Sequence, residues 1–301
     1  MEKKIVKKID IHAHASVSGW PSFAAGAPMI TPEELLAIYD KLGVEKGVLL
    51  PLLTNTVFQP NSNYEMQQIA EKYPDRFAWF CIFDPWQLKN SPNTDFMPFL
   101  EFCKSKGAKG VGEVCANVPF DDPRMENLMR QCEAANLPFT IHIGLDGGEY
   151  GVADEEIGLP KLEKALQKFP KLRILGHSQR FWYELSKYAY RDPDYNFNRG
   201  KVIPGGRVEQ LMRKYPNLLC DLSAGSGYGA MTRDPEYTYG FMEEFADRLY
   251  YGIDICRADQ GDAPMTRLAK FLDDAMLEGK ISYDTYYKIS RGNAEKLLGL
   301  V

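Results

Sequence analysis

The chain has 301 residues, a formal net charge of −5 and a composition that is 45% apolar and 26% charged. Such a chain can bury a large core, which excludes the class of disordered proteins, and its acidic balance excludes the basic surface that nucleic acids and anionic lipids require. No run reaches the roughly 18 apolar residues of a membrane helix, and no cleavable apolar region follows the first residues. We therefore expect a cytoplasmic protein with reduced thiols and with no nucleic-acid or membrane partner.

Eight short runs rich in branched and aromatic residues alternate with longer stretches of helical period. This alternation is typical of repeated βα units around a parallel sheet, and eight such units predict an α/β fold, a (β/α)8 TIM-type barrel. Because no linker or low-complexity tract interrupts the pattern, we expect residues 1–301 to form a single domain. The predicted strands are Ile5–Ile11, Lys46–Leu53, Phe77–Phe83, Gly110–Val114, Phe139–Ile143, Leu172–Leu175, Leu218–Asp221 and Leu249–Gly252.

The predicted helices carry start and stop signals. Thr31 offers an N-cap, Pro32 suits the first helical position, and Gly43 suits the residue that follows a helix ending near Leu42. Three later helices end in a basic residue, an aromatic residue and a proline, which stops each helix before the next strand. They should begin near Asn63, Leu159 and Gly206 and end at Lys72, Lys168 and Lys214.

Two segments are longer than the loops of a compact barrel. Residues 15–30, which follow the first strand, are rich in small residues and proline, and residues 178–203, which follow the sixth, are rich in aromatic residues. Long segments of this kind often form lids or binding loops. The second segment could equally be a helix packed on a neighbouring subunit of a homo-oligomer, because aromatic residues are enriched at interfaces as well as in pockets.

All four histidines of the chain follow strand-like runs. His12 and His14 lie in IDIHAHA, His142 lies in FTIHIG and His177 lies in RILGHS. Asp254 takes the same position after the eighth run, in LYYGIDI. A single histidine in an apolar run is more often a hydrogen-bonded core residue, but the carboxyl ends of barrel strands meet at one mouth, so we expect these five side chains to form one site.

The spacing of His12 and His14 favours metal binding. Strand side chains alternate, so the two imidazoles point to the same face and can hold one ion, although an H-x-H motif alone is a weak signal. Imidazole and carboxylate ligands suit a divalent metal, and a catalytic ion keeps one position open. We expect one ion per chain, with Zn²⁺ as the first choice and Mn²⁺ or Fe²⁺ as alternatives.

At these motifs the chain resembles the amidohydrolase superfamily, and within it the amidohydrolase-2 group, which includes aminocarboxymuconate-semialdehyde decarboxylase-like enzymes and lactonases. The resemblance runs from IDIHAHA through GVGEV, FTIHIG, LGHSQ and YGIDI to the closing RGNAEKLLGL. It implies that His12, His14, His142 and Asp254 are metal ligands. It also implies that His177 stays off the metal, which would leave it free for acid/base catalysis; the alternatives are a fifth ligand or a structural residue.

Glu113 ends the fourth run, where many binuclear relatives place a carboxylated lysine, and Lys109 precedes that run. Glu113 could be a metal ligand, a partner that orients a ligating histidine, or an acid inside the barrel. Arg180, Arg191 and Arg257 follow metal-bearing strands and could hold a substrate carboxylate through paired hydrogen bonds, unless they are solvated surface residues. Residues 223–229, after the seventh strand, could shape the pocket or form a flexible turn.

We expect hydrolysis of an amide, lactone or related carbonyl substrate by metal-activated water, with Asp254 and His177 as acid/base groups. The small-molecule substrate could carry a carboxylate. The alternative is metal-dependent, non-oxidative decarboxylation of an aromatic or muconate-type acid by nearly the same residues. A catalytically silent metal-binding scaffold is a third interpretation, but structural zinc sites usually close all four positions with Cys and His.

Overall fold

The computed structural model of the protein describes residues 4–22, 26–55, 57, 61–144, 150–154, 156–187 and 200–301. The strands are β1 Lys8–Ala13, β2 Val44–Leu49, β3 Phe77–Trp79, β4 Val111–Val114, β5 Phe139–Gly144, β6 Val152–Ala153, β7 Ile174–His177, β8 Leu218–Asp221 and β9 Leu249–Tyr250. The α-helices are α1 Pro32–Leu42, α2 Asn63–Lys72, α3 Met97–Ser105, α4 Pro123–Ala134, α5 Pro160–Lys168, α6 Gln179–Tyr183, α7 Arg207–Lys214, α8 Ala224–Thr232, α9 Pro235–Glu244, α10 Leu268–Leu277, α11 Tyr283–Tyr287 and α12 Asn293–Leu298. Short 3₁₀ turns (η2 Ala246–Arg248, η3 Ala258–Asp262, η4 Pro264–Arg267) and a π-helical turn (η5 Lys288–Gly292) complete these elements.

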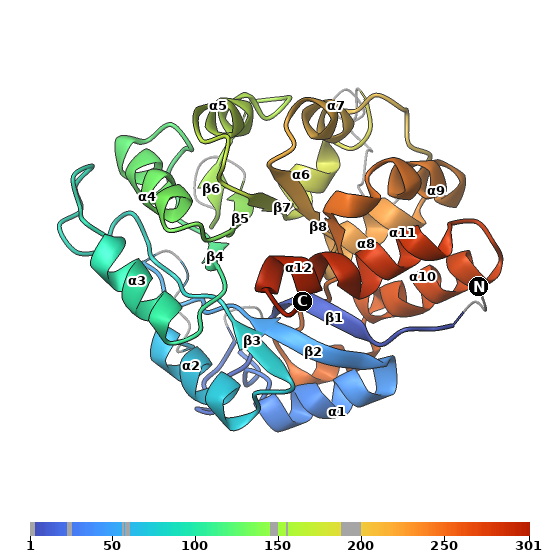
Figure 1. Ribbon diagram of the computed structural model, residues 1–301, viewed down its shortest axis with the longest axis horizontal. Coiled ribbons are helices and arrows are strands. Elements are labelled where there is room, and N and C mark those ends of the chain that lie inside the picture. Colours follow the sequence, from blue (N-terminus) through green and yellow to red (C-terminus); the bar gives the residue numbers. More distant parts are fainter. Residues whose placement is uncertain are drawn as a thin grey trace.

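The strands form a closed parallel barrel with helices around it (Figure 1). They pair in the orders β1–β2–β3 and β4–β5–β7–β8–β9, with the short β6 beside β5. Backbone hydrogen bonds join the two sets at both seams. The Cys81 amide donates to the Gly110 carbonyl at 2.9 Å, and the Ile11 amide donates to the Tyr251 carbonyl at 3.0 Å. The fold is therefore the predicted (β/α)8 TIM-type barrel.

The helix start and stop signals are confirmed. Thr31 Oγ1 accepts from the Glu34 amide at 3.2 Å, and the Glu34 carboxylate accepts from the Thr31 amide at 2.9 Å, so α1 has a complete capping box. Gly43 follows α1 with a φ of 70°, which only glycine adopts without strain. The helices α2, α5 and α7 begin within one residue of the predicted positions and end at the predicted lysines.

Each predicted strand overlaps an observed strand, with differences at the ends. The strand β1 begins at Lys8 rather than at residue 5, and β3 ends at Trp79 rather than at residue 83. Beyond Trp79 the chain keeps only an isolated bridge from Cys81 to Val111. The apolar run therefore continues past the strand, because Ile82 and Phe83 are buried although they lie beyond the end of β3.

Apolar side chains fill the barrel interior, and α12 packs against them. Leu297 and Leu298 of α12 belong to this interior cluster, and Figure 1 shows α12 across the centre of the barrel. Because packed barrel interiors leave no pore, the interior supports the site rather than holding a ligand. The cluster comprises Ile9, Ile11, Val48, Leu50, Ala78, Phe80, Leu175, Leu219, Tyr250, Ala294, Leu297 and Leu298.

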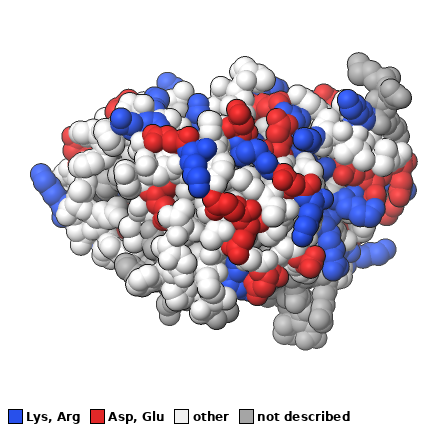
Figure 2. Space-filling view, turned by 90° about the horizontal axis from the view of Figure 1, so that it is seen from below, with Lys and Arg blue, Asp and Glu red and all other residues white. Residues whose placement is uncertain are grey.

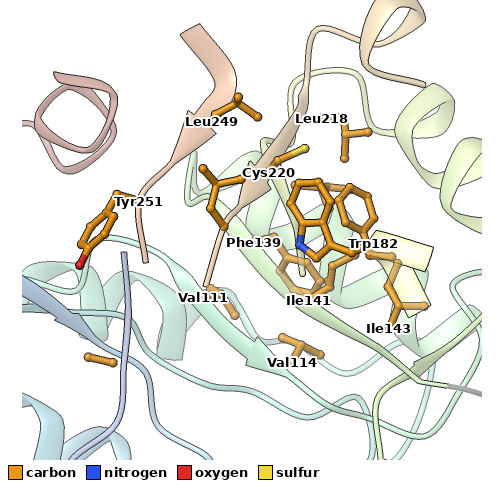
Figure 3. Packing of buried hydrophobic residues seen from close by; sticks show 14 of the residues in the cluster. Val111, Val114, Phe139, Ile141, Ile143, Trp182, Leu218, Cys220, Leu249 and Tyr251 are labelled. Carbon is orange, nitrogen blue, oxygen red and sulfur yellow. The ribbon is translucent and has the colours of Figure 1, made fainter. Parts of the chain in front are cut away.

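The first part of the aromatic-rich segment 178–203 belongs to the core. Phe181 and Trp182 of α6 are fully buried, and Trp182 Nε1 donates to the Asp221 carbonyl at 3.2 Å. Figure 3 shows the Trp182 indole among buried residues of β4, β5 and β8. These two aromatic residues therefore lie in neither a lid nor a subunit interface. Residues 188–199, which hold the later aromatic residues of this segment, lie outside the described residues.

The distribution of charged side chains on the surface and the free state of the cysteines agree with what the composition predicts. Figure 2 shows acidic and basic side chains interspersed on the face that it displays. Among the described helices, none is both long enough and apolar enough to cross a bilayer. All six cysteines are free thiols, and only Cys256 is more than slightly exposed.

Candidate active site

The six predicted acid and histidine residues lie together at the carboxyl ends of the strands. His12 is on β1, His142 on β5, His177 at the end of β7 and Glu113 on β4. His14 directly follows β1, and Asp254 follows β9. Each of the six has a nitrogen or oxygen atom within 4 Å of another member of the set. The prediction that residues distant in sequence meet at one barrel mouth is confirmed.

An irregularity in β1 turns its two histidines toward the barrel axis. Ile9 and Ile11 belong to the interior cluster, whereas Ala13 and Ala15 belong to the outer core between strands and helices. The pairing of β1 with β2 shifts register between Asp10 and Ala13. Such an irregularity changes the alternation of side chains along a strand. As a result, His12 and His14 continue the inward face of the strand.

The Nδ1 atom of each of these two histidines contacts a hydrogen-bond acceptor. This contact fixes the tautomer of each imidazole. His12 Nδ1 lies 2.6 Å from Asp221 Oδ2, and His14 Nδ1 lies 2.8 Å from the Leu50 carbonyl oxygen. Because both partners accept, each imidazole donates from Nδ1, and its neutral form carries a lone pair on Nε2. The two Nε2 atoms are only 3.1 Å apart. Lone pairs at this distance repel each other unless a proton or a metal ion lies between them.

Two carboxylates complete a set of four donor atoms. Glu113 Oε2 lies 3.3 Å from His12 Nε2 and 3.5 Å from His14 Nε2. Asp254 Oδ1 lies 3.7 Å and 3.3 Å from the same two nitrogens. Ligands on a tetrahedral ion with bonds of about 2.1 Å are about 3.4 Å apart. The separations between the two imidazole nitrogens, and from each nitrogen to the two carboxylates, therefore suit ligands of one divalent ion.

The second oxygen of Glu113 faces the other two histidines. Glu113 Oε1 lies 2.6 Å from His142 Nδ1 and 3.6 Å from His177 Nε2. The carboxylate thus lies between the His12–His14 pair and the His142–His177 pair. Further groups of potential ligands combine Glu113 with Cys115 and His142, Asp254 with His14 and Cys256, and Asp254 with His12 and His177. Direct ligation of the first ion by His142 stays a prediction, because His142 Nδ1 lies against a Glu113 oxygen.

The charges of the site favour a cation. Burial disfavours the charged form of His12, but the carboxylates of Asp254, Asp221 and Glu113 outweigh it and raise its pKa well above the usual value. Burial is outweighed in the same way at His14, where hydrogen bonds to Asp254 and Glu113 raise the pKa to about 9. The same carboxylates that attract protons to these imidazoles also attract a metal ion. A bound metal ion would displace those protons from the ligand nitrogens.

A cavity of about 160 Å³ opens directly onto these residues. Its polar side is formed by His14, Glu113, His142 and Asp254, and the side chains of Leu52, Val57 and Tyr150 add apolar surface. The Tyr150 ring packs on the His142 imidazole with a centroid separation of 4.6 Å. The remaining lining residues are Cys115, Cys256 and Gln260.

The structure does not bring Arg180 or Arg257 to this cavity. Arg180 is buried, with Nη1 2.8 Å from Glu184 Oε1 and Nη2 2.7 Å from the Glu156 carbonyl oxygen. The Arg257 guanidinium contacts Asp259, with Nε 2.9 Å from Oδ1. Neither arginine is among the lining residues. Arg191 lies outside the described residues, so substrate binding by these arginines stays a prediction.

Most of residues 223–229 form a helix and not the flexible turn that was one of the two expectations for them. From Ala224 onward they are the first turns of helix α8, which ends at Thr232. A Cβ atom on Gly227 would lie 2.3 Å from the Leu222 carbonyl oxygen. This glycine is therefore needed for close packing of backbone and not for the freedom of a turn.

Asp221 was missed in the sequence, and Ser223 was predicted only as part of the segment 223–229 and not as a partner of His177. Asp221 ends β8, and its Oδ2 lies close to both His12 Nδ1 and, at 3.4 Å, His177 Nδ1. The Ser223 hydroxyl lies 3.1 Å from His177 Nδ1. An available signal was the acid at the end of the seventh predicted strand, which has the same position as Glu113 on the fourth. The lining thiols and Tyr150 gave no such signal, because nothing in their local sequence separates them from core residues.

Comparisons with known proteins agree with this architecture. The sequence model of a family described as amidohydrolase matches residues 9–300. The search of curated proteins found no match. Among solved structures, an uncharacterized TIM-barrel protein from Bordetella bronchiseptica has a TM-score of 0.65 at 18% identity, covering 98% of this chain and 99% of that chain.

Two further neighbours have names that state an activity. A probable 2-pyrone-4,6-dicarboxylic acid hydrolase from Acinetobacter baumannii, with citric acid bound, has a TM-score of 0.59 at 17% identity, covering 98% of this chain and 100% of that chain. A dihydroxybenzoic acid decarboxylase from Polaromonas sp. JS666, with bound manganese and 2-nitroresorcinol, has a TM-score of 0.57 at 15% identity, covering 98% and 97%. These likenesses show a shared fold. Because the family model spans nearly the whole chain, the protein belongs to the amidohydrolase family.

Proposed function

We propose that the protein is a metal-dependent enzyme that acts on a carbonyl or carboxyl group of a small molecule, with hydrolysis as the first candidate reaction. The observation that carries this proposal is the set of four donor atoms from His12, His14, Glu113 and Asp254. The five separations that involve a histidine nitrogen run from 3.1 Å to 3.7 Å, and His14, Glu113 and Asp254 line a cavity of about 160 Å³.

The residues of this set fit a resident divalent ion. Asp221 and the Leu50 carbonyl hold the outer nitrogens of His12 and His14, as expected around ligating histidines. Two imidazoles and two carboxylates suit zinc, and manganese, which the Polaromonas neighbour contains, is the alternative. When bound, the ion would polarise a substrate oxygen and lower the pKa of water from 15.7 toward about 7. We propose one ion per chain.

Asp254 is the proposed base. Although burial acts in the opposite direction, His12 and His14 lower the pKa of the Asp254 carboxyl, so this group is ionised at neutral pH. Its backbone has a φ of 63°, which is unusual for a residue with a side chain, and its amide donates to the His12 carbonyl at 2.9 Å. This hydrogen bond holds Asp254 beside β1, where the carboxylate can accept a proton from a water molecule at the cavity.

In hydrolysis, the oxygen of water bonds to the substrate carbonyl carbon while the carbon–nitrogen or carbon–oxygen bond of the amide or lactone breaks. Asp254 takes up one proton of the water, and the leaving nitrogen or oxygen receives a proton. Asp254 can pass the proton that it took from water to the leaving atom, and His177, whose Nε2 lies 3.8 Å from Asp254 Oδ2, is proposed to assist this transfer. Leu52, Val57 and Tyr150 would pack on the apolar part of the substrate.

Decarboxylation is the second candidate, and the shape of the cavity supports it. The apolar surface of Leu52, Val57 and Tyr150 stands beside the polar ligand side, which suits a planar ring that carries a carboxyl group. In this reaction the bond between ring carbon and carboxyl carbon breaks, carbon dioxide leaves, and the ring carbon receives a proton. Asp254, after taking a proton from water or from the carboxyl group of the substrate, would pass that proton to the ring carbon, assisted by His177.

A substrate panel in ¹⁸O-labelled water tests the proposal. Metal-loaded protein is incubated with lactones, amides, and aromatic and muconate-type acids, and products and carbon dioxide are measured separately. Hydrolysis predicts ¹⁸O in the product, whereas carbon dioxide release without ¹⁸O would assign decarboxylation. Asp254→Asn should abolish turnover, and Asp262→Asn, at an exposed carboxylate eight residues later, should leave it unchanged. Turnover that survives both metal removal and Asp254→Asn would refute the proposal.

A further inference from the structure

We infer that the Ser223 hydroxyl donates its hydrogen bond to Nδ1 of His177, so that His177 presents an N–H group to the site instead of a lone pair. Ser223 is then a positioning residue that decides which kind of chemistry His177 can perform. The meaning of this inference rests on the proposed function, because an imidazole can ligate a metal only through a lone pair.

Among the described residues, the Ser223 hydroxyl has one hydrogen-bond acceptor. Ser223 Oγ lies 3.1 Å from His177 Nδ1, and both side chains are buried, at 0% and 1% exposed. Within the described part of the chain, this nitrogen is the only hydrogen-bond partner of the hydroxyl. If His177 Nδ1 carried a proton, the Ser223 proton would be buried without an acceptor, which native structures avoid. The serine therefore donates and the imidazole accepts.

The competing acceptor for a proton on His177 Nδ1 is farther away and makes its shorter hydrogen bonds to other groups. Asp221 Oδ2 lies 3.4 Å from that nitrogen, but it also lies 2.6 Å from His12 Nδ1. The other oxygen of Asp221 accepts from the Ser223 amide at 2.9 Å. Both oxygens of the carboxylate are thus engaged in shorter hydrogen bonds, so Asp221 offers His177 only a long contact.

The opposite side of the ring favours the same tautomer. His177 Nε2 faces Glu113 Oε1 at 3.6 Å and Asp254 Oδ2 at 3.8 Å. Carboxylate oxygens attract an N–H group and repel a lone pair. A proton on Nε2 therefore suits both neighbours, whereas a proton on Nδ1 would leave a lone pair facing two acids.

The three innermost histidines thus divide into two kinds. His12 and His14 donate outward from Nδ1 and turn a lone pair inward, which suits metal ligation. His177 accepts from Ser223 and turns a hydrogen inward, which suits donation to a substrate oxygen or to a leaving group. The structure offers this physical reason for His177 to stay off the metal.

Nitrogen NMR of the imidazoles tests the inference. The full-length protein is labelled with ¹⁵N-histidine and measured at pH 8, both metal-free and loaded with zinc. Only four histidines contribute signals, and His177→Gln identifies the signal of interest. We expect a protonated Nε2 and an unprotonated Nδ1 for His177. A protonated Nδ1, alone or in an imidazolium, would overturn the inference.

Ser223→Ala removes the proposed donor without adding volume. We expect the proton of His177 to move to Nδ1, toward Asp221, in this variant. Ser226→Ala is the matched control, because Ser226 has a buried hydroxyl with no hydrogen-bond partner among the described residues. That control should leave the His177 tautomer unchanged. An Nε2 proton that persists in Ser223→Ala would contradict the role of Ser223, whereas the expected tautomers in a protein without turnover would contradict only the proposed function.

Discussion

Asp154→Asn should stabilise the protein at neutral pH and leave its stability unchanged in weak acid. Asp154 is fully buried, and its Oδ2 accepts from the Leu162 amide at 2.8 Å, at the start of α5. Its Oδ1 has no hydrogen-bond partner within the described residues. Burial, opposed by the amide hydrogen bonds of Leu162 and Lys161, raises the pKa of this carboxyl from 3.8 to about 6. Asn keeps the acceptor for Leu162, removes the charge and, like the protonated acid, places a donor at the Oδ1 position.

The size and sign follow from proton linkage. A pKa that is higher in the folded state means that folding takes up a proton between pH 3.8 and about pH 6. The resulting stability is complete below pH 3.8 and is lost as the pH rises through 6. A difference of about two units corresponds to about 3 kcal/mol of unfolding free energy. The asparagine variant has no such loss, so its advantage should grow from near zero at pH 4 to about 3 kcal/mol above pH 7.

Urea unfolding of both proteins, followed by circular dichroism between pH 4.5 and pH 7.5, measures this advantage. Effects of pH on other groups act on both proteins and cancel in the difference. Asp262→Asn, at an exposed carboxylate, should show no such trend and serves as the control. An advantage of Asp154→Asn that is independent of pH, or that decreases as the pH rises, would refute the reasoning.

Three other substitutions have defined outcomes. His177→Asn should keep its metal and its folding stability while turnover falls by about 10²-fold or more, the size of an acid/base contribution. Metal analysis and steady-state kinetics check this prediction. Loss of the metal in this variant would make His177 a ligand. Asp221→Asn should weaken metal affinity by about 10- to 100-fold, because it weakens the hydrogen bond that orients the His12 imidazole. Competition with a chelator measures the affinity. An unchanged affinity would contradict the role of Asp221. Gly176→Ala should destabilise the protein by about 1–3 kcal/mol, because the new Cβ would lie 2.5 Å from the Phe181 ring. Gly240→Ala, where a Cβ meets nothing within 4 Å, is the control in the same unfolding assay, and equal effects would contradict the packing argument.

The location of the site could be predicted because it depends on topology. Strand ends in a parallel barrel meet at one mouth, so His12, His142, His177 and Asp254 could be grouped from their positions after strand-like runs. The helix signals at Thr31 and Gly43 were similarly reliable, because capping depends on residues that are adjacent in sequence.

The partners of these residues could not be predicted, because they depend on directions in space. Arg180 and Arg257 follow strands of the site, but each has an acid within four residues, Glu184 and Asp259, to which its guanidinium turns. The division of the Glu113 carboxylate between two pairs of histidines depends on the position of each oxygen atom, which a sequence pattern does not contain. The contact between Ser223 and His177 joins residues 46 positions apart.

The most direct test of the account is the position of the metal ion. Crystals of the zinc-loaded protein, with anomalous diffraction recorded at the zinc edge, locate each ion and its ligands. We expect one ion per chain, bound at about 2.0–2.2 Å by His12 Nε2, His14 Nε2, Glu113 Oε2 and Asp254 Oδ1, with His177 Nε2 outside bonding distance. An ion ligated by His177, or a first ion held by Glu113, Cys115 and His142 instead, would contradict the account.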